Sequence, residues 1–77
     1  MDIKVLGPGC PKCKETEQVV RKAVDAAGVQ ASVEKITDFQ QMMAYGVMST
    51  PAVVVDGQVK VVGRVPSVDE VRSWIAS

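Results

Sequence analysis

The fold is decided near the N-terminus, by the stretch I-K-V-L-G-P-G-C-P-K-C (residues 3–13). Its first four residues predict a short apolar strand, which Gly7-Pro8-Gly9 stops. Cys10 then stands at the N-cap position of a helix. Pro11 takes the first helical position, where its missing N–H costs nothing. The stretch therefore predicts two cysteines on the first turn of a helix that follows a strand.

Strands and helices alternate along the rest of the chain. The helix after Cys10 has one apolar face and stops at Gly28. Because a helix connects residues 3–6 to residues 29–36, those two strands are expected to be parallel. A short helix is predicted next, capped by Thr37 or Asp38 and ending near Gly46. Two strands follow, over residues 52–55 and 58–62, and Asp56-Gly57 forms the hairpin turn between them. A capping box of Ser67 and Glu70 begins the last helix. We therefore expect one α/β domain over residues 1–77, with the order β-α-β-α-β-β-α and a four-stranded mixed sheet covered by helices on both faces.

Composition excludes several classes of function. The chain has 77 residues, a formal net charge of zero and no histidine. A balanced charge gives no basic footprint for nucleic acid or for a membrane surface, and no apolar run reaches the roughly 18 residues that span a bilayer. The short polar N-terminus does not resemble a signal peptide, so we expect a cytoplasmic protein. We also expect it to be a monomer. Without histidine no His metal site is possible within the chain, and two cysteines cannot complete a four-cysteine zinc site in a monomer.

The cysteine pair is the remaining chemical feature. On one helical turn the Cα atoms of Cys10 and Cys13 lie about 5–6 Å apart, a separation that a disulfide tolerates. Cys10 at the helix N-terminus is the expected nucleophile, because that position lowers a thiol pKa. Cys13, one turn inside, is the expected resolving thiol. The alternative is a pair of buried structural cysteines, but C-x-x-C at a strand-to-helix turn favours redox chemistry.

A second motif, Ser49-Thr50-Pro51, precedes the apolar strand. Together with G-P-G-C-P-K-C (7–13), S-T-P-A-V-V-V-D-G (49–57) and G-R-V-P-S (63–67), it makes nearly the whole chain resemble the thioredoxin superfamily. More narrowly, the chain resembles the small archaeal-type thioredoxins of glutaredoxin-like size, called redox-active disulfide proteins.

The resemblance implies a function and a site. The function is protein-disulfide oxidoreduction on client proteins, with a reversible Cys10–Cys13 disulfide and no other cofactor. The active-site loop would include Gly9, Pro11 and Lys12. The Thr50–Pro51 bond would be cis and face the cysteines, and Thr50 would offer backbone hydrogen bonds to an extended substrate.

The chain departs from larger relatives at three places. Gly9 replaces the Trp that ordinary thioredoxins carry before the first cysteine. Residues 3–6 lack the buried Asp that helps to deprotonate the second cysteine, so the base for Cys13 stays open. Arg64 follows Gly63 where glutaredoxins place an acidic residue for the ammonium group of glutathione, although Asp69 and Glu70 could partly substitute. We therefore expect a thioredoxin-reductase-type flavoenzyme, and not glutathione, as the electron donor.

Alternatives remain open at this stage. Copper-chaperone domains also carry C-x-x-C after a strand, and two thiolates suit Cu(I), but those domains resemble βαββαβ with a Met where Pro8 stands. A redox sensor using the same pair is a third possibility. Helical spacing predicts that Phe39, Met42 and Met43 belong to the core rather than to a partner groove. Two interpretations stay open for three other side chains. Met48 and Tyr45 either flank the active site or pack within the protein. Arg64 either forms an ion pair with an acidic surface residue or contacts a partner protein.

Overall fold

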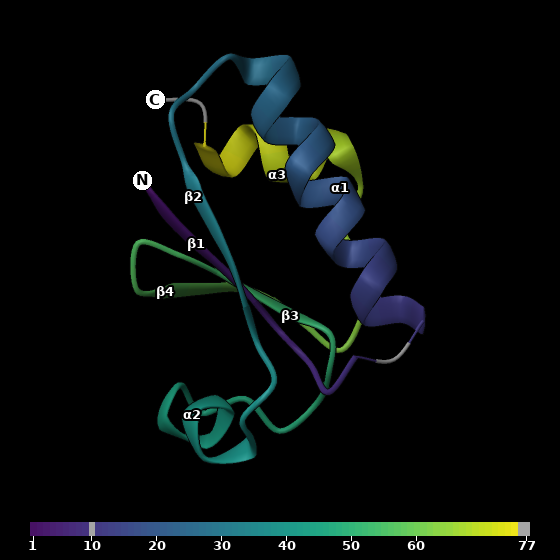
Figure 1. Ribbon diagram of the computed structural model, residues 1–77, viewed down its shortest axis with the longest axis vertical. Coiled ribbons are helices and arrows are strands. Elements are labelled where there is room, and N and C mark those ends of the chain that lie inside the picture. The colour runs from purple at the N-terminus through teal and green to yellow at the C-terminus, as the bar shows by residue number, and fades with distance from the viewer. Residues whose placement is uncertain (10, 76–77) are drawn as a thin grey trace.

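A four-stranded mixed sheet lies at the centre of the computed structural model, which describes residues 1–9 and 11–75 (Figure 1). The strands and helices are β1 (Asp2–Leu6), α1 (Pro11–Ala27), β2 (Ser32–Ile36), α2 (Phe39–Ala44), β3 (Ala52–Val55), β4 (Gln58–Val62) and α3 (Val68–Ile75). In the sheet order β2-β1-β3-β4, β1 is parallel to β2 and antiparallel to β3, and β4 is antiparallel to β3. The predicted fold class and element order are confirmed.

The strands bury side chains on both faces of the sheet. Because successive strand residues point to opposite faces, Val53 and Val55 of β3 pack under α1 and α3, whereas Ala52 and Val54 pack on the α2 side. Figure 1 shows α1 and α3 together on one side of the sheet and α2 apart from them. Each fully buried valine contributes about 1.5–3 kcal/mol relative to an exposed one. The first cluster packs α1 and α3 on one face of the sheet, and the second packs α2 on the other.

The second strand is the element whose bounds differ most from the sequence prediction, whereas α2 agrees with it. The second strand begins at Ser32, not at residue 29, because its partner β1 begins at Asp2, which lies opposite Ser32. Residues 29–31 therefore precede the region that β1 pairs with. The short helix α2 ends at Ala44, with Asp38 as its N-cap and a hydrogen bond of 2.9 Å from Gln40 N to the Asp38 carboxylate. Thr37 is thus not the cap.

The predicted capping box of α3 is present. The Ser67 hydroxyl accepts from Glu70 N, and the Glu70 carboxylate accepts from Ser67 N, both at 3.1 Å. Arg64 also donates two hydrogen bonds to the same carboxylate, at 2.9 and 2.6 Å. Of the two interpretations of Arg64, the structure therefore shows the ion pair with an acidic residue, which is Glu70. The Arg64 hydrogen bonds, followed by the Ser67 backbone donor, lower the pKa of Glu70 from 4.5 to about 2.

This lowered pKa predicts a pH dependence of stability. A carboxyl whose pKa is depressed on folding stabilises the protein above its unfolded pKa, and that contribution is lost as pH falls through the folded pKa. The contribution of Glu70 should therefore fade between pH 4.5 and about 2. In urea unfolding over this range, Glu70→Gln should be less stable than the parent at pH 6, and the difference should shrink towards pH 2.

The matched control is Asp69→Asn, which removes a first-turn carboxylate and leaves the Arg64 pair and the capping box intact. If Asp69→Asn and Glu70→Gln shift the unfolding midpoint identically at every pH, the Arg64 pair is not the source of the effect.

Candidate active site

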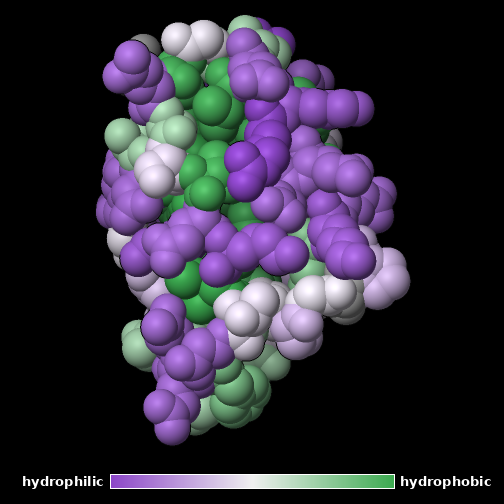
Figure 2. All heavy atoms as spheres, in the orientation of Figure 1, coloured by the Kyte–Doolittle hydropathy of each residue, from purple (hydrophilic) through white to green (hydrophobic). Residues whose placement is uncertain are grey.

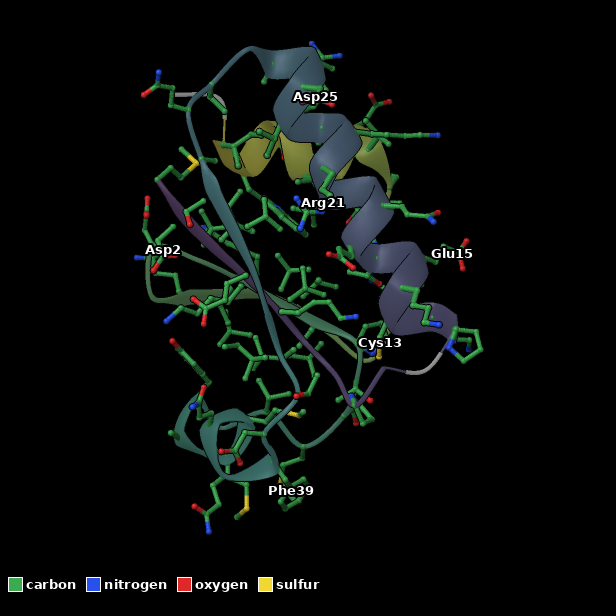
Figure 3. The ribbon with its side chains drawn as sticks, viewed as in Figure 1. Asp2, Cys13, Glu15, Arg21, Asp25 and Phe39 are labelled. Carbon is green, nitrogen blue, oxygen red and sulfur yellow. The ribbon has the colours of Figure 1, made fainter. Side chains whose placement is uncertain are left out.

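Cys13 lies on the first turn of α1, next to the end of β1 (Figure 3). Its side chain is only 2% exposed, which agrees with a place one turn inside the helix. Cys10, the predicted nucleophile, lies outside the described residues. The neighbouring Pro11 and Lys12 are exposed at the start of α1, so this end of the helix faces solvent.

The connection between β1 and α1 is built from glycine and proline. Gly9 has a φ of 92°, in the left-handed region that favours glycine. Pro11 occupies the first position of α1, as predicted, where no backbone donor is lost. Lys12 is held in the first turn through its carbonyl, which accepts a 2.8 Å hydrogen bond from the buried Thr16 hydroxyl. These features fix the turn on which Cys13 sits.

The loop before β3 approaches this turn from the other side. The Thr50–Pro51 bond is cis, the isomer that the resemblance implied, and Pro51 is buried. A Cβ placed on Gly7 would lie 3.8 Å from the Thr50 Cβ and against the side chain of Cys13. Residues 7, 13 and 50, far apart in sequence, therefore meet at one point. The Thr50–Pro51 loop therefore lies beside the first turn of α1, which carries Cys13.

Residues after β4 complete this loop. Gly63 N donates a 2.8 Å hydrogen bond to the Pro51 carbonyl, and a Cβ on Gly63 would lie 3.4 Å from the Ser49 Cβ. Arg64 follows directly and is paired with Glu70. The segment that carries Arg64 is therefore attached to the Thr50–Pro51 loop.

An exposed apolar surface continues from the site towards α2. Phe39 is 69% exposed, Met43 58% and Met48 94%, while Met42 is buried. The prediction that Phe39 and Met43 belong to the core is therefore wrong. A helix of six residues has fewer than two turns, and only Met42 packs into the cluster below α2. Figure 3 shows Phe39 directed away from the sheet, and Figure 2 shows apolar atoms at the α2 end of the molecule.

Two adjoining hollows of about 200 Å³ each give this surface its shape. One is lined by Phe39, Met43, Gly46, Val47 and Met48. The other shares Phe39, Val47 and Met48 and reaches Pro8 and Thr50. The apolar surface therefore joins the loop beside Cys13. We call Phe39, Met43 and Met48, with the two hollows, the apolar surface.

Tyr45 and Met48 have different roles in this region. Tyr45 packs against the cluster below α2, and its hydroxyl accepts a 3.2 Å hydrogen bond from Lys4 Nζ. That hydrogen bond is the largest cause of a raised Lys4 pKa. Met48, by contrast, projects into solvent beside Thr50. Of the two readings, packing holds for Tyr45 and flanking the site holds for Met48.

Sequence reasoning missed two features of the site. It treated Gly7 only as a strand stop, although Gly7 contacts the Cys13 side chain. It also missed the exposure of Phe39 and Met43. Asp38 and Gly46 are close in the sequence, and this spacing could have revealed that exposure. A helix that must fit between them is too short to bury many of its side chains.

Within residues 1–9 and 11–75, no group of three or more His, Cys, Asp or Glu side chains could hold a metal ion. The last element of the described residues is α3, whereas a βαββαβ domain has a strand at this place in the order. Over the same residues, no helix is long and apolar enough to cross a membrane.

Comparison with known proteins agrees with this architecture. The family model described as a thioredoxin domain matches residues 1–76. A thioredoxin of Methanothermobacter thermautotrophicus is 38% identical over 76 residues, covering 99% of both chains. A thioredoxin of Methanocaldococcus jannaschii is 37% identical over 75 residues, which cover 97% of this chain and 86% of the relative. With a mixed four-stranded sheet, a cysteine on the first turn of α1 and a Thr-Pro loop beside it, this chain belongs to the thioredoxin family.

Proposed function

We propose that this chain is a dithiol–disulfide oxidoreductase that reduces disulfides of client proteins through Cys10 and Cys13. The observation that carries the proposal is the meeting of the Cys13 turn with the Thr50–Pro51 loop. The buried sulfur of Cys13, three residues after Cys10 in the sequence, is suited to resolve a mixed disulfide. Membership of the thioredoxin family supports the same class of reaction.

The proposed reaction has two steps. The Cys10 thiolate attacks one client sulfur, so that a Cys10–client bond forms, the client disulfide breaks and the other client sulfur leaves as a thiolate. Cys13 then loses its proton and attacks Cys10, forming the Cys10–Cys13 disulfide and releasing the second client sulfur. The client gains two electrons and two protons, and the protein dithiol is oxidised to a disulfide.

A flavoenzyme of the thioredoxin-reductase type is the proposed electron donor. Two cysteines allow the cycle to close within the chain, without a second thiol molecule. Arg64, on the segment attached to the Thr50–Pro51 loop, stands where glutaredoxins carry an acidic residue. Its partner Glu70 is held in a two-point ion pair, so its carboxylate is already engaged. With both its oxygens bound to Arg64, the Glu70 carboxylate is a poor partner for the ammonium group of glutathione.

The test is a coupled assay of insulin-disulfide reduction with two electron sources. One arm contains NADPH and a thioredoxin reductase, and the other contains glutathione, glutathione reductase and NADPH. We expect efficient turnover in the first arm and only slow turnover in the second. Efficient turnover with glutathione alone would contradict the donor but leave the oxidoreductase proposal intact. Failure of both arms, together with failure of dithiothreitol-driven reduction, would contradict the oxidoreductase proposal itself.

The proposed partner of the apolar surface is the client segment that carries the disulfide. Thr50 lies beside the turn that carries Cys13, and the hollow that Thr50 lines belongs to the apolar surface. Exposed methionines adapt to differently shaped apolar side chains. We therefore expect the surface to bind apolar residues next to the client disulfide.

Replacing Met48 with serine tests this contact. Losing the burial of one large apolar side chain costs about 1.4 kcal/mol, which raises KM roughly tenfold for a peptide whose disulfide has apolar neighbours. A small aromatic disulfide reagent should be reduced at the parental rate. Val59→Ser on β4 is the control, since Val59 is a partly exposed apolar residue that lines neither hollow. An unchanged KM for the peptide in Met48→Ser would remove the apolar surface from client binding.

A further inference from the structure

Gly7 occupies a position where any side chain would collide with Cys13. It follows β1 directly and is buried, and its N–H donates a 2.9 Å hydrogen bond to the Ile36 carbonyl. A Cβ built on Gly7 would overlap the Cys13 Sγ and would lie 3.0 Å from the Cys13 Cβ. The Cys13 Sγ therefore occupies the volume that a side chain at residue 7 would need.

Backbone conformation does not explain the glycine. The glycines with positive φ are Gly9, Gly28, Gly46, Gly57 and Gly63, and Gly7 is not among them. Gly7 N–H also continues the β1–β2 hydrogen bonding by one residue, at the point where the chain bends out of β1. The φ of Gly7 lies outside the left-handed region that favours glycine, and the clash of a Cβ with Cys13 makes the requirement for glycine at this position steric.

We propose that Gly7 is a positioning residue for Cys13, a role that rests on the proposed function. Without a side chain at residue 7, the Cys13 Sγ packs directly on the backbone at the end of β1. A methyl group there would drive the sulfur away from its place or tilt the first turn of α1. In the second step of the reaction, Cys13 must approach the Cys10 sulfur in line with the Cys10–client bond. Gly7 therefore controls resolution of the mixed disulfide and not its formation.

The test is Gly7→Ala in a single-turnover reaction with a fluorescent peptide that carries one disulfide. Acid quenching and non-reducing electrophoresis separate the mixed disulfide from the products. A displacement of about 1 Å in a reacting group costs up to roughly 100-fold in rate. We expect mixed-disulfide formation within about twofold of the parent and resolution at least about tenfold slower. Resolution at the parental rate would overturn the proposal, whereas failure of the parent to reduce the peptide would overturn the proposed function instead.

A control separates this effect from general destabilisation. Gly28→Ala introduces strain at a φ of 65°, at the far end of α1, where a Cβ meets no other atom within 4 Å. It should lower the urea midpoint and leave the ratio of formation to resolution unchanged. If Gly28→Ala slows resolution as much as Gly7→Ala does, the effect is one of stability and Gly7 has no positioning role.

A double variant keeps the proposal testable even when Gly7→Ala folds poorly. Cys13→Ala removes the Sγ and leaves only the 3.0 Å contact with the Cβ. Under reducing conditions, Gly7→Ala should therefore lower the urea midpoint less in the Cys13→Ala background than in the parent. If Gly7→Ala lowers the urea midpoint equally in both backgrounds, or if the double variant is as unfolded as Gly7→Ala alone, the Cys13 sulfur is not the reason why residue 7 must be glycine.

Discussion

Replacing Cys10 with serine is expected to abolish reduction of client disulfides. A serine hydroxyl is not ionised near neutral pH and forms no mixed disulfide, so the first step of the proposed reaction is lost. Cys13 cannot take over this role efficiently, because its side chain is 2% exposed and lies against Gly7. In the insulin assay the rate should fall to that of the donor system alone.

Alkylation gives an independent test of this assignment. In the reduced parent near pH 7, an iodoacetamide label read by peptide mass spectrometry should appear on Cys10 well before Cys13. Faster labelling of Cys13 would reverse the assigned roles. Lys22→Gln is a suitable control for Cys10→Ser, since it removes an exposed side chain further along α1, outside the active-site loop, and retains both cysteines. It should keep most of the parental turnover.

The order of the elements could be predicted from local signals. Gly7-Pro8-Gly9 ends one strand, Asp56-Gly57 turns the hairpin with φ values of 49° and 81°, and Ser67 with Glu70 opens α3. Each of these signals depends on residues within a few positions of one another. Local chemistry decides such features, so a single sequence contains them.

Features that depend on distant partners could not be predicted in the same way. The start of the second strand is set by its partner β1, which begins at Asp2. The exposure of Phe39 depends on how α2 lies over the sheet, and the contact of Gly7 with Cys13 depends on the junction of β1 with α1. At the site, the place of Cys13 on the helix followed from the sequence, whereas its steric relation to Gly7 needed the packed structure.

Replacing Cys13 with serine is expected to produce a long-lived mixed disulfide between Cys10 and a client. The first step of the proposed reaction needs Cys10 alone and should proceed. The second step needs a thiolate one turn further along α1, and serine supplies none. The buried place of residue 13 also keeps external thiols from approaching along that side. The conjugate should therefore persist for at least about 100 times the lifetime of the parental intermediate.

The conjugate can be measured directly with the fluorescent disulfide peptide. After mixing equimolar Cys13→Ser and peptide, a non-reducing gel should show one fluorescent band at the mass of the conjugate, which dithiothreitol removes. Thr16→Ser is the matched control, because Thr16 is buried one turn along the same face and its hydroxyl bond to Lys12 is kept by serine. That control should release the peptide as fast as the parent does. If Cys13→Ser also releases the peptide at the parental rate, another group resolves the intermediate, and both the assigned role of Cys13 and the positioning role of Gly7 fail together.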